Sequence, residues 1–145
     1  MKLERVVYPM IRHATLEDLN ILLDLDNDIE YSEMENIIKL ERVLVYENED
    51  KLIGWLRYNM FWDHIPFLNK LYILKPYRNK GIGLELMNYW ETELRAMGHY
   101  LAMTSSLAEE SAQHFYRKLE YQDAGSFVLP GENLEIIFVK QLGQV

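Results

Sequence analysis

The residues best suited to bind an anion lie near the middle of the chain, in the stretch Arg78–Gly83. This stretch follows the strand-like run Leu71–Leu74 and precedes Leu84–Met97, whose apolar residues recur at helical spacing. A strand that passes through a glycine-containing turn into a helix leaves the first helical N–H groups without intrachain partners, at the positive end of the helix dipole. Phosphate oxygens bind well there, and Arg78 and Lys80 would add charge-assisted contacts. The plain alternative is an ordinary connection that carries a solvated basic pair.

The elements that must position this stretch are predicted from apolar periodicity and turn residues. In chain order we expect a strand at 10–12, a helix that begins after Thr15 and reaches Asp26, a helix at 33–40, a hairpin of strands at 43–46 and 52–58, a strand that ends near 74, a helix at 84–97 closed by Gly98, a strand at 100–103, a helix at 109–119, and strands at 127–129 and 136–139. This order predicts a mixed α+β fold with a mostly antiparallel sheet and about four helices. No linker or repeat interrupts it, so we expect one domain over residues 1–145, with residues 1–9 as an N-terminal extension.

Composition excludes several classes of protein. The 145 residues contain no cysteine, which rules out disulfides, cysteine nucleophiles and cysteine-ligated zinc. No apolar run approaches the roughly 18 residues of a membrane span, and the first residues lack the apolar core of a signal peptide. No histidine spacing indicates a metal site. We therefore expect a cytoplasmic protein without a membrane or metal partner.

The net charge of −8 is concentrated in one segment. Residues 16–41 contain nine acidic side chains and one basic side chain, Lys39. An acidic chain is poorly suited to nucleic acid, which requires a basic face. The acidic segment is either a solvated helix surface or a means of attracting a cationic substrate.

Two motifs in a fixed order resemble those of the GCN5-related N-acetyltransferases, a superfamily that moves an acetyl group from acetyl-CoA to an amine. Arg78-x-x-Gly81-x-Gly83 resembles their pyrophosphate-binding motif. Ala112–Tyr121 is similar to their second motif, Ala-x-x-Phe-Tyr-x-Lys-x-Gly-Phe/Tyr, and Met10–Thr15 resembles their usual opening. The likeness spans residues 10–140, so acetyl-CoA is the implied co-substrate.

The resemblance implies roles for particular residues. Tyr116 would act as the general acid that protonates the departing thiolate, since the ordinary tyrosine pKa of about 10 keeps it protonated at neutral pH. Contacts to the coenzyme are implied for Leu71, Ile73, Arg78, Asn79, Lys80, Gly81, Ile82, Gly83, Leu84, Glu109, Ala112 and Tyr116. Outside its motif, Tyr116 is better explained as an ordinary core tyrosine.

Direct attack by an amine requires that a base remove its proton. The position that often holds a glutamate base in this superfamily is Asn69, which can only hold a water. The other candidate bases are Asp63, His64, Glu30 and Tyr31, although a single loop histidine is more often a surface residue. Two further departures from the second motif are Glu109, in place of a frequent asparagine, and Glu120, in place of a glycine. Glu120 would restrict the turn if that residue must adopt a positive φ.

The identity of the acceptor amine is the property that the sequence determines least. In this superfamily the first two helices and their connection usually wall the amine site, so Asp24, Asp26, Asp28 and Glu30 could select a cationic small molecule. We expect acceptor contacts from Asp28, Glu30, Tyr31, Trp55 and Tyr58, although aromatic residues on a strand are more often core. A protein or peptide acceptor and a non-catalytic sensor of acetyl-CoA are the alternatives. A homodimer is expected through an exposed sheet edge.

Overall fold

The computed structural model describes residues 7–143, and its elements follow the expected order. The strands are β1 (Met10–His13), β2 (Val43–Asn48), β3 (Lys51–Phe61), β4 (Ile65–Ile73), β5 (Leu101–Leu107), β6 (Gln122–Phe127) and β7 (Glu135–Gln141). The helices are α1 (Leu19–Leu25), α2 (Tyr31–Lys39), α3 (Ile82–Ala96) and α4 (Ala112–Lys118), with short 3₁₀ turns at Leu16–Asp18 and Lys75–Tyr77. Residues 1–6 of the expected extension lie outside the described residues, whereas Tyr8 donates a hydrogen bond to Asp50 Oδ1 at 2.7 Å.

The strands are hydrogen bonded in the order β1-β2-β3-β4-β5-β7-β6, which confirms the mixed α+β fold. The chain divides into two compact units. The first contains the described residues up to Arg57 together with Lys70–Trp90, and the second contains Tyr58–Asn69 and the described residues from Glu91 onward. The single domain expected from the sequence stays a prediction. No helix among residues 7–143 is both long and apolar enough to cross a membrane.

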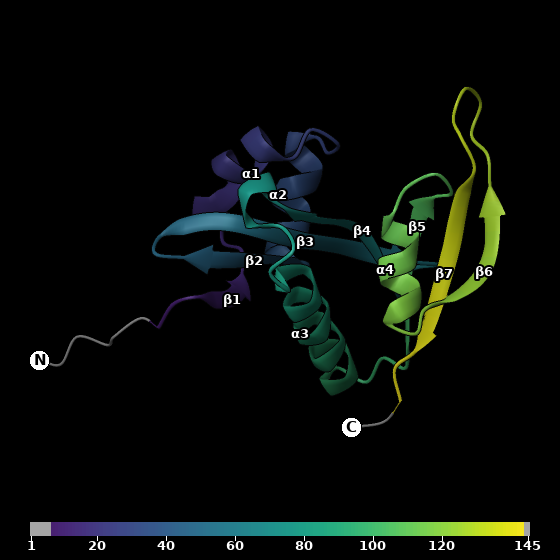
Figure 1. Ribbon diagram of the computed structural model, residues 1–145. Helices are drawn as coiled ribbons and strands as arrows, with labels where there is room; N and C mark the ends of the chain where they lie inside the picture. The colour runs from purple at the N-terminus through teal and green to yellow at the C-terminus, as the bar shows by residue number, and fades with distance from the viewer. Residues whose placement is uncertain (1–6, 144–145) are drawn as a thin grey trace, which may run out of the picture. The chain divides into compact units, whose positions relative to one another are not determined.

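In the first unit, α1 and α2 pack on one face of β2 and β3 (Figure 1). Leu22, Met34, Val43, Val45 and Trp55 are buried at this interface, and each buried side chain of this size contributes about 1.5–3 kcal/mol. The predicted hairpin is confirmed, with β2 and β3 joined by a two-residue turn at 49–50. Both turn residues have positive φ, as tight hairpins require.

The second unit is built on β5, which pairs with β7 over seven residues, and on β6 at the edge of the sheet (Figure 1). On its other side β5 pairs in parallel with β4 at Phe67↔Met103 and Leu68↔Thr104. The hydroxyl of Thr104 donates to the Leu68 carbonyl at 3.1 Å, so a side chain reinforces the second of these rungs.

Some boundaries differ from those expected. The strand predicted at 127–129 is wrong, because β6 runs over the preceding polar residues and ends at Phe127. Every residue of β6 is exposed, and its hydrogen bonds to β7 rather than an apolar pattern hold it. The helix predicted at 109–119 begins only at Ala112. Gly98 ends α3 with a φ of 91°, as expected for a helix terminator.

Candidate active site

The loop before α3 has the backbone geometry that anion binding requires. The Glu85 amide donates to the Gly81 carbonyl at 3.0 Å, so the amides of residues 82–84 precede the first hydrogen bond of the helix. Asn79 and Gly81 have φ values of 64° and 81°, and this left-handed conformation is one that glycine adopts at least cost. A Cβ at Gly81 would have no heavy atom within 4 Å, so conformation rather than space demands glycine there.

The basic side chains of this loop are held by neighbouring groups. Arg78 Nε donates to the Ile73 carbonyl at 2.9 Å, and its guanidinium lies 5.0 Å from the centre of the Tyr72 ring. Lys80 lies 5.8 Å from the ring centre of Tyr77. Arg78 and Lys80 are both exposed, so their charges face solvent while the ring contacts orient their side chains. The carbonyl of Ile73, expected to pair with the coenzyme, already accepts one hydrogen bond.

Tyr116 lies on α4 in the second unit and is only 6% exposed. Its ring packs against Phe138 of β7 and Tyr121, with ring centres 6.0 and 5.9 Å away. Burial raises the pKa of Tyr116 to about 12; the Glu110 carboxylate acts in the same direction, and a hydrogen bond with Thr104 opposes them. The tyrosine is therefore a poorer proton donor than its ordinary pKa indicates.

The Tyr121 ring, which contacts Tyr116, is held in place by the buried carboxylate of Glu91. The hydroxyl of Tyr121 donates to Glu91 Oε2 at 2.8 Å, and Lys140 Nζ donates to Glu91 Oε1 at 2.7 Å. Burial, followed by the charge of Glu91, raises the pKa of Tyr121 above its ordinary value. These contacts fix the ring on which Tyr116 rests.

Two residues considered for removal of the amine proton, Asn69 and His64, lie in β4 and in the turn before it. Asn69 is exposed and directly follows Leu68, at the second parallel rung with β5. His64 lies in the turn before β4, with Nδ1 2.7 Å from the Trp62 carbonyl oxygen. Four residues of extended chain place His64 about 13 Å from Leu68. The assignment of His64 as a base stays a prediction.

The residues expected to contact the acceptor, all in the first unit except Tyr58, fall into buried and exposed groups. Trp55 is 0% exposed and Tyr58 is also buried, so both rings belong to the core. Glu30 and Tyr31 are exposed where α2 begins. Asp28 is exposed and forms an ion pair with Lys70 at 2.6 Å.

The expectation that Asp26 attracts a cation needs correction. Its side chain is 0% exposed and accepts hydrogen bonds from Arg57 Nε at 2.7 Å and Trp55 Nε1 at 3.0 Å. Burial alone would raise the pKa of Asp26, but the hydrogen bond and charge of Arg57 outweigh it and hold the pKa below its ordinary value. Asp26 is thus an internal counter-ion, and its charge is already compensated.

The two residues that depart from the second motif, Glu109 and Glu120, lie on either side of α4. Glu109 precedes α4 and accepts a hydrogen bond from Asn133 Nδ2 at 2.5 Å, while Ala112 is the first residue of the helix. Glu120 has a φ of 72°, the conformation that the usual glycine would favour. The sequence reasoning missed Glu135, at the start of β7.

Glu135 accepts a hydrogen bond from Ser105 Oγ at 3.3 Å. Burial raises its pKa, the nearby charges of Glu110 and Glu132 add to this, and the Ser105 hydrogen bond opposes them. A carboxyl group with a raised pKa is better matched to proton transfer near neutral pH than an ordinary one. No local motif marked this residue, because its burial and its contact with Ser105 depend on segments far away in sequence.

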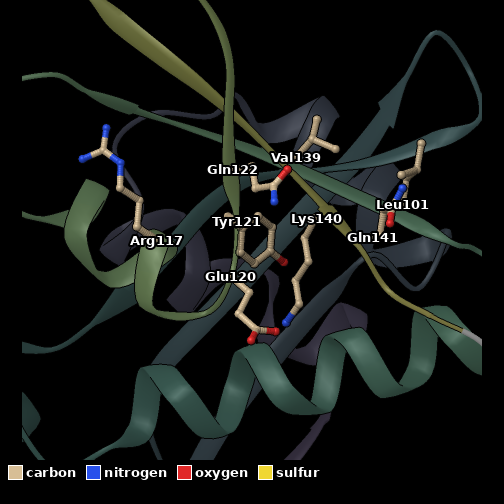
Figure 2. Close-up of a pocket in the computed structure, with 8 residues that line it drawn as sticks. All are labelled: Leu101, Arg117, Glu120, Tyr121, Gln122, Val139, Lys140 and Gln141. Carbon is tan, nitrogen blue, oxygen red and sulfur yellow. The ribbon is translucent and has the colours of Figure 1, made fainter.

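A pocket of about 650 Å³ lies elsewhere in the second unit (Figure 2). Its lining comes from β5, β6, β7, the last turn of α4 and the connection that follows it: Leu101, Arg117, Glu120, Tyr121, Gln122, Val139, Lys140 and Gln141. Figure 2 shows Lys140 extending beside the Tyr121 ring, with its Nζ 5.6 Å from the ring centre. None of the residues expected to bind coenzyme or acceptor lines this pocket. No group of three or more potential metal-binding side chains is found in the described part of the chain.

The expected site residues are thus grouped by unit. The first unit holds the loop before α3, Leu71, Ile73, and the connection between α1 and α2. The second unit holds Tyr116, Asn69, Glu109, Ala112 and Glu135. Within residues 7–143, seven strands, four α-helices and a glycine-containing loop before α3 form the arrangement expected for the acyl-CoA-dependent acyltransferases that the sequence resembles.

Residues 9–121 match the sequence model of the acetyltransferase (GNAT) family, and the chain belongs to this family. It is accordingly an N-acetyltransferase, as the resemblance implied. No curated protein matches the chain in sequence.

Solved structures with the same fold include an acetyltransferase of the GNAT family from Streptococcus pneumoniae, with 19% identity, a TM-score of 0.77, and coverage of 92% of this chain and 99% of that one. Ribosomal-protein-alanine N-acetyltransferase from Brucella melitensis has 21% identity, a TM-score of 0.77, and coverage of 91% and 99%. Ribosomal-protein-S18-alanine N-acetyltransferase from Escherichia coli has 15% identity, a TM-score of 0.79, and coverage of 94% and 95%. At these identities the likeness is one of fold.

Proposed function

We propose that this chain transfers the acetyl group of acetyl-CoA to the primary amine of a small cationic molecule by direct attack. The new N–C bond forms as the C–S bond breaks, one proton leaves the amine, and the departing thiolate takes up one proton from solvent. No side-chain nucleophile is required, which suits a chain without cysteine. The observation that carries the proposal is the left-handed Gly81 beside the open amides of α3, within the region matched by the family.

The coenzyme contacts divide between backbone and side chains. The amides of residues 82–84 would hold the pyrophosphate, where the helix dipole favours negative charge. Arg78 and Lys80 would add charge, with the Nη groups of Arg78 available because its Nε is directed to Ile73. Leu71 and Ile73 would contact the pantetheine arm from β4, and Ala112 of the second unit stays an expected coenzyme contact.

Tyr116 would donate a hydrogen bond to the departing sulfur. A pKa of about 12 keeps its hydroxyl protonated at every physiological pH. Because a thiol has a pKa of about 8.5, complete proton transfer would be uphill, and the hydrogen bond itself would supply the stabilisation. The amine proton would leave through a water held by Asn69 or to the carboxylate of Glu135, whose pKa is raised.

Fewer acidic side chains are available to bind a cationic acceptor than the sequence indicated. Asp26 and Asp28 are already paired with basic side chains, which leaves the exposed Asp24, Glu30 and Tyr31 as the proposed contacts for a cation in the first unit. A protein or peptide amine is the second candidate, because two solved structures with this fold carry the name ribosomal-protein-alanine N-acetyltransferase.

The test combines acetyl-CoA, the protein and a panel of polyamines, amino sugars, free lysine and peptides, with release of free thiol as the readout. Turnover of small cationic amines supports the proposal, and turnover of peptides alone supports the second candidate. Coenzyme binding without turnover across the panel indicates a sensor. Absence of coenzyme binding contradicts the whole proposal.

A matched pair of variants isolates the loop. Gly81 and Gly131 share a φ of 81°, and neither has a heavy atom within 4 Å of its Cβ position. Alanine at either site costs roughly 1–2 kcal/mol of stability through backbone strain. We expect Gly81→Ala to weaken coenzyme binding and Gly131→Ala to leave it unchanged.

The proposal retains a cytoplasmic location, which the cysteine-free composition fits. It also retains a homodimer, because β6 is a fully exposed strand at the edge of the sheet. Light scattering during gel filtration measures the oligomeric state.

A further inference from the structure

Tyr72, near the end of β4, is the centre of a set of contacts that neither motif includes. Its ring lies 5.0 Å from the ring of Trp55, 5.0 Å from the Arg78 guanidinium and 5.4 Å from Lys70 Nζ. The residue is 36% exposed, so part of the ring is buried against the core while two cations contact the same ring. Each cation–π contact is favourable and orients the charge that makes it.

Two of these neighbours connect Tyr72 to the acceptor loop, defined here as residues 26–30 between α1 and α2. Trp55 donates its indole N–H to Asp26 at 3.0 Å, at the start of the loop. Lys70 binds Asp28 at 2.6 Å, in the middle of the loop. The acceptor loop therefore reaches the Tyr72 ring by two separate routes, one through the core and one at the surface.

The third neighbour connects Tyr72 to the coenzyme loop. Two contacts hold the Arg78 side chain. Its Nε donates a hydrogen bond to the Ile73 carbonyl, and its guanidinium lies over the Tyr72 ring. The position of the Tyr72 ring thus determines where the charge of Arg78 is presented.

Gly54 on β3 allows this arrangement. A Cβ at Gly54 would lie 2.8 Å from Ile73 Cδ1 and 3.3 Å from the Tyr72 carbonyl oxygen. The absence of a side chain lets residues 72–73 approach β3 closely, beside Trp55. The ring of Tyr72 is therefore placed by backbone packing as well as by its neighbours.

We propose that Tyr72 is a positioning residue that couples the order of the acceptor loop to the placement of Arg78 for the coenzyme. This inference rests on the proposed function, because it assumes that Arg78 contacts the pyrophosphate. When Asp28 is paired with Lys70, the Tyr72 ring is held in place and orients the Arg78 guanidinium. When the acceptor loop does not make this ion pair, Arg78 loses part of the contact that orients it. By linkage, coenzyme binding would order the acceptor loop to the same extent.

The test is a double-mutant cycle on coenzyme A affinity, measured by calorimetry. In the otherwise unchanged protein, we expect Asp28→Asn to weaken coenzyme A binding by about threefold to tenfold, the range of one cation–π contact. Direct electrostatics predicts the opposite sign, because removal of a negative charge favours an anionic ligand. The effect of Asp28→Asn should disappear in a Tyr72→Leu background and persist in a Tyr72→Phe background, since the ring makes the contacts.

Glu33→Gln is the control, because it removes an exposed acid from α2 that has no proposed role and should not weaken binding. If Tyr72→Leu fails to fold, Lys70→Met serves as the second background, in which Asp28→Asn should again have no effect. Unchanged or tighter binding in Asp28→Asn overturns the coupling, as does an equal weakening in the Tyr72→Leu or Lys70→Met background. Failure of the unaltered protein to bind coenzyme A contradicts the proposed function instead.

Discussion

Replacement of Tyr116 by phenylalanine tests the proposed chemistry most directly. The substitution removes one hydroxyl from a side chain that is 6% exposed and leaves its packing against Phe138 and Tyr121 in place. Coenzyme A affinity should therefore change little, whereas the rate of thiol release should fall. The size of that fall distinguishes a hydrogen-bond donor from a full general acid.

The magnitude follows from the raised pKa. A tyrosine with a pKa of about 12 faces a thiol with a pKa of about 8.5, and the difference makes complete proton transfer unfavourable by about 5 kcal/mol. A hydrogen bond to a developing charge instead contributes about 1.5–3 kcal/mol, which corresponds to a fall of about 10-fold to 150-fold in kcat. A full general acid would contribute about 10²-fold to 10⁴-fold.

The assay is steady-state thiol release between pH 6 and pH 10, with the best amine of the panel and Tyr89→Phe on the exposed face of α3 as the control. Since the pKa of Tyr116 is about 12, its titration should add no descending limb to the kcat profile in this range. A descending limb that is present in the unaltered protein and absent in Tyr116→Phe would refute the reasoning from burial. A change below threefold would remove Tyr116 from the mechanism.

Three further predictions concern individual residues. Glu120→Gly should raise the unfolding free energy by about 0.5–1 kcal/mol in calorimetry, since relief of left-handed strain exceeds the added entropy of glycine; Glu132→Gly, a loop residue outside the positive-φ set, should lower it. Asp26→Asn should cost about 3–5 kcal/mol in urea unfolding at pH 7, because Arg57 keeps a buried charge without its counter-ion. The lowered pKa of Asp26 means that its contribution is present above the ordinary carboxyl pKa of about 4 and lost as pH falls through the lower folded value, so the variant should lack that loss. If Glu135 is the base, kcat should rise with pH through its raised pKa, and Glu135→Gln should abolish that limb; an unchanged profile would exclude it.

The loop before α3 was predictable because every signal it needs is local. The strand, the glycine turn and the apolar stripe of the helix are consecutive in sequence, and their periodicities require no distant partner. The structure places α3 at Ile82–Ala96 rather than at the predicted 84–97. The hairpin of β2 and β3 was predictable for the same reason.

The strand β6 was missed because its formation depends on another strand. Its residues 122–126 are polar or small and carry no alternation, so no local pattern distinguishes them from a loop. The antiparallel ladder of β7 holds them in extended conformation. An edge strand exposed on both faces has no apolar face to reveal it.

The sequence by itself determined the order of the elements, the family and the glycine-containing loop before α3, because these depend on motifs and periodicities within a few residues. Only the tertiary structure decided which acidic side chains are available. Asp26 is neutralised by Arg57, 31 residues away, and Tyr116 and Glu135 acquire raised pKa values from the groups that bury them. Charge and proton affinity depend on burial and distance, and both arise only when segments remote in the chain are packed together.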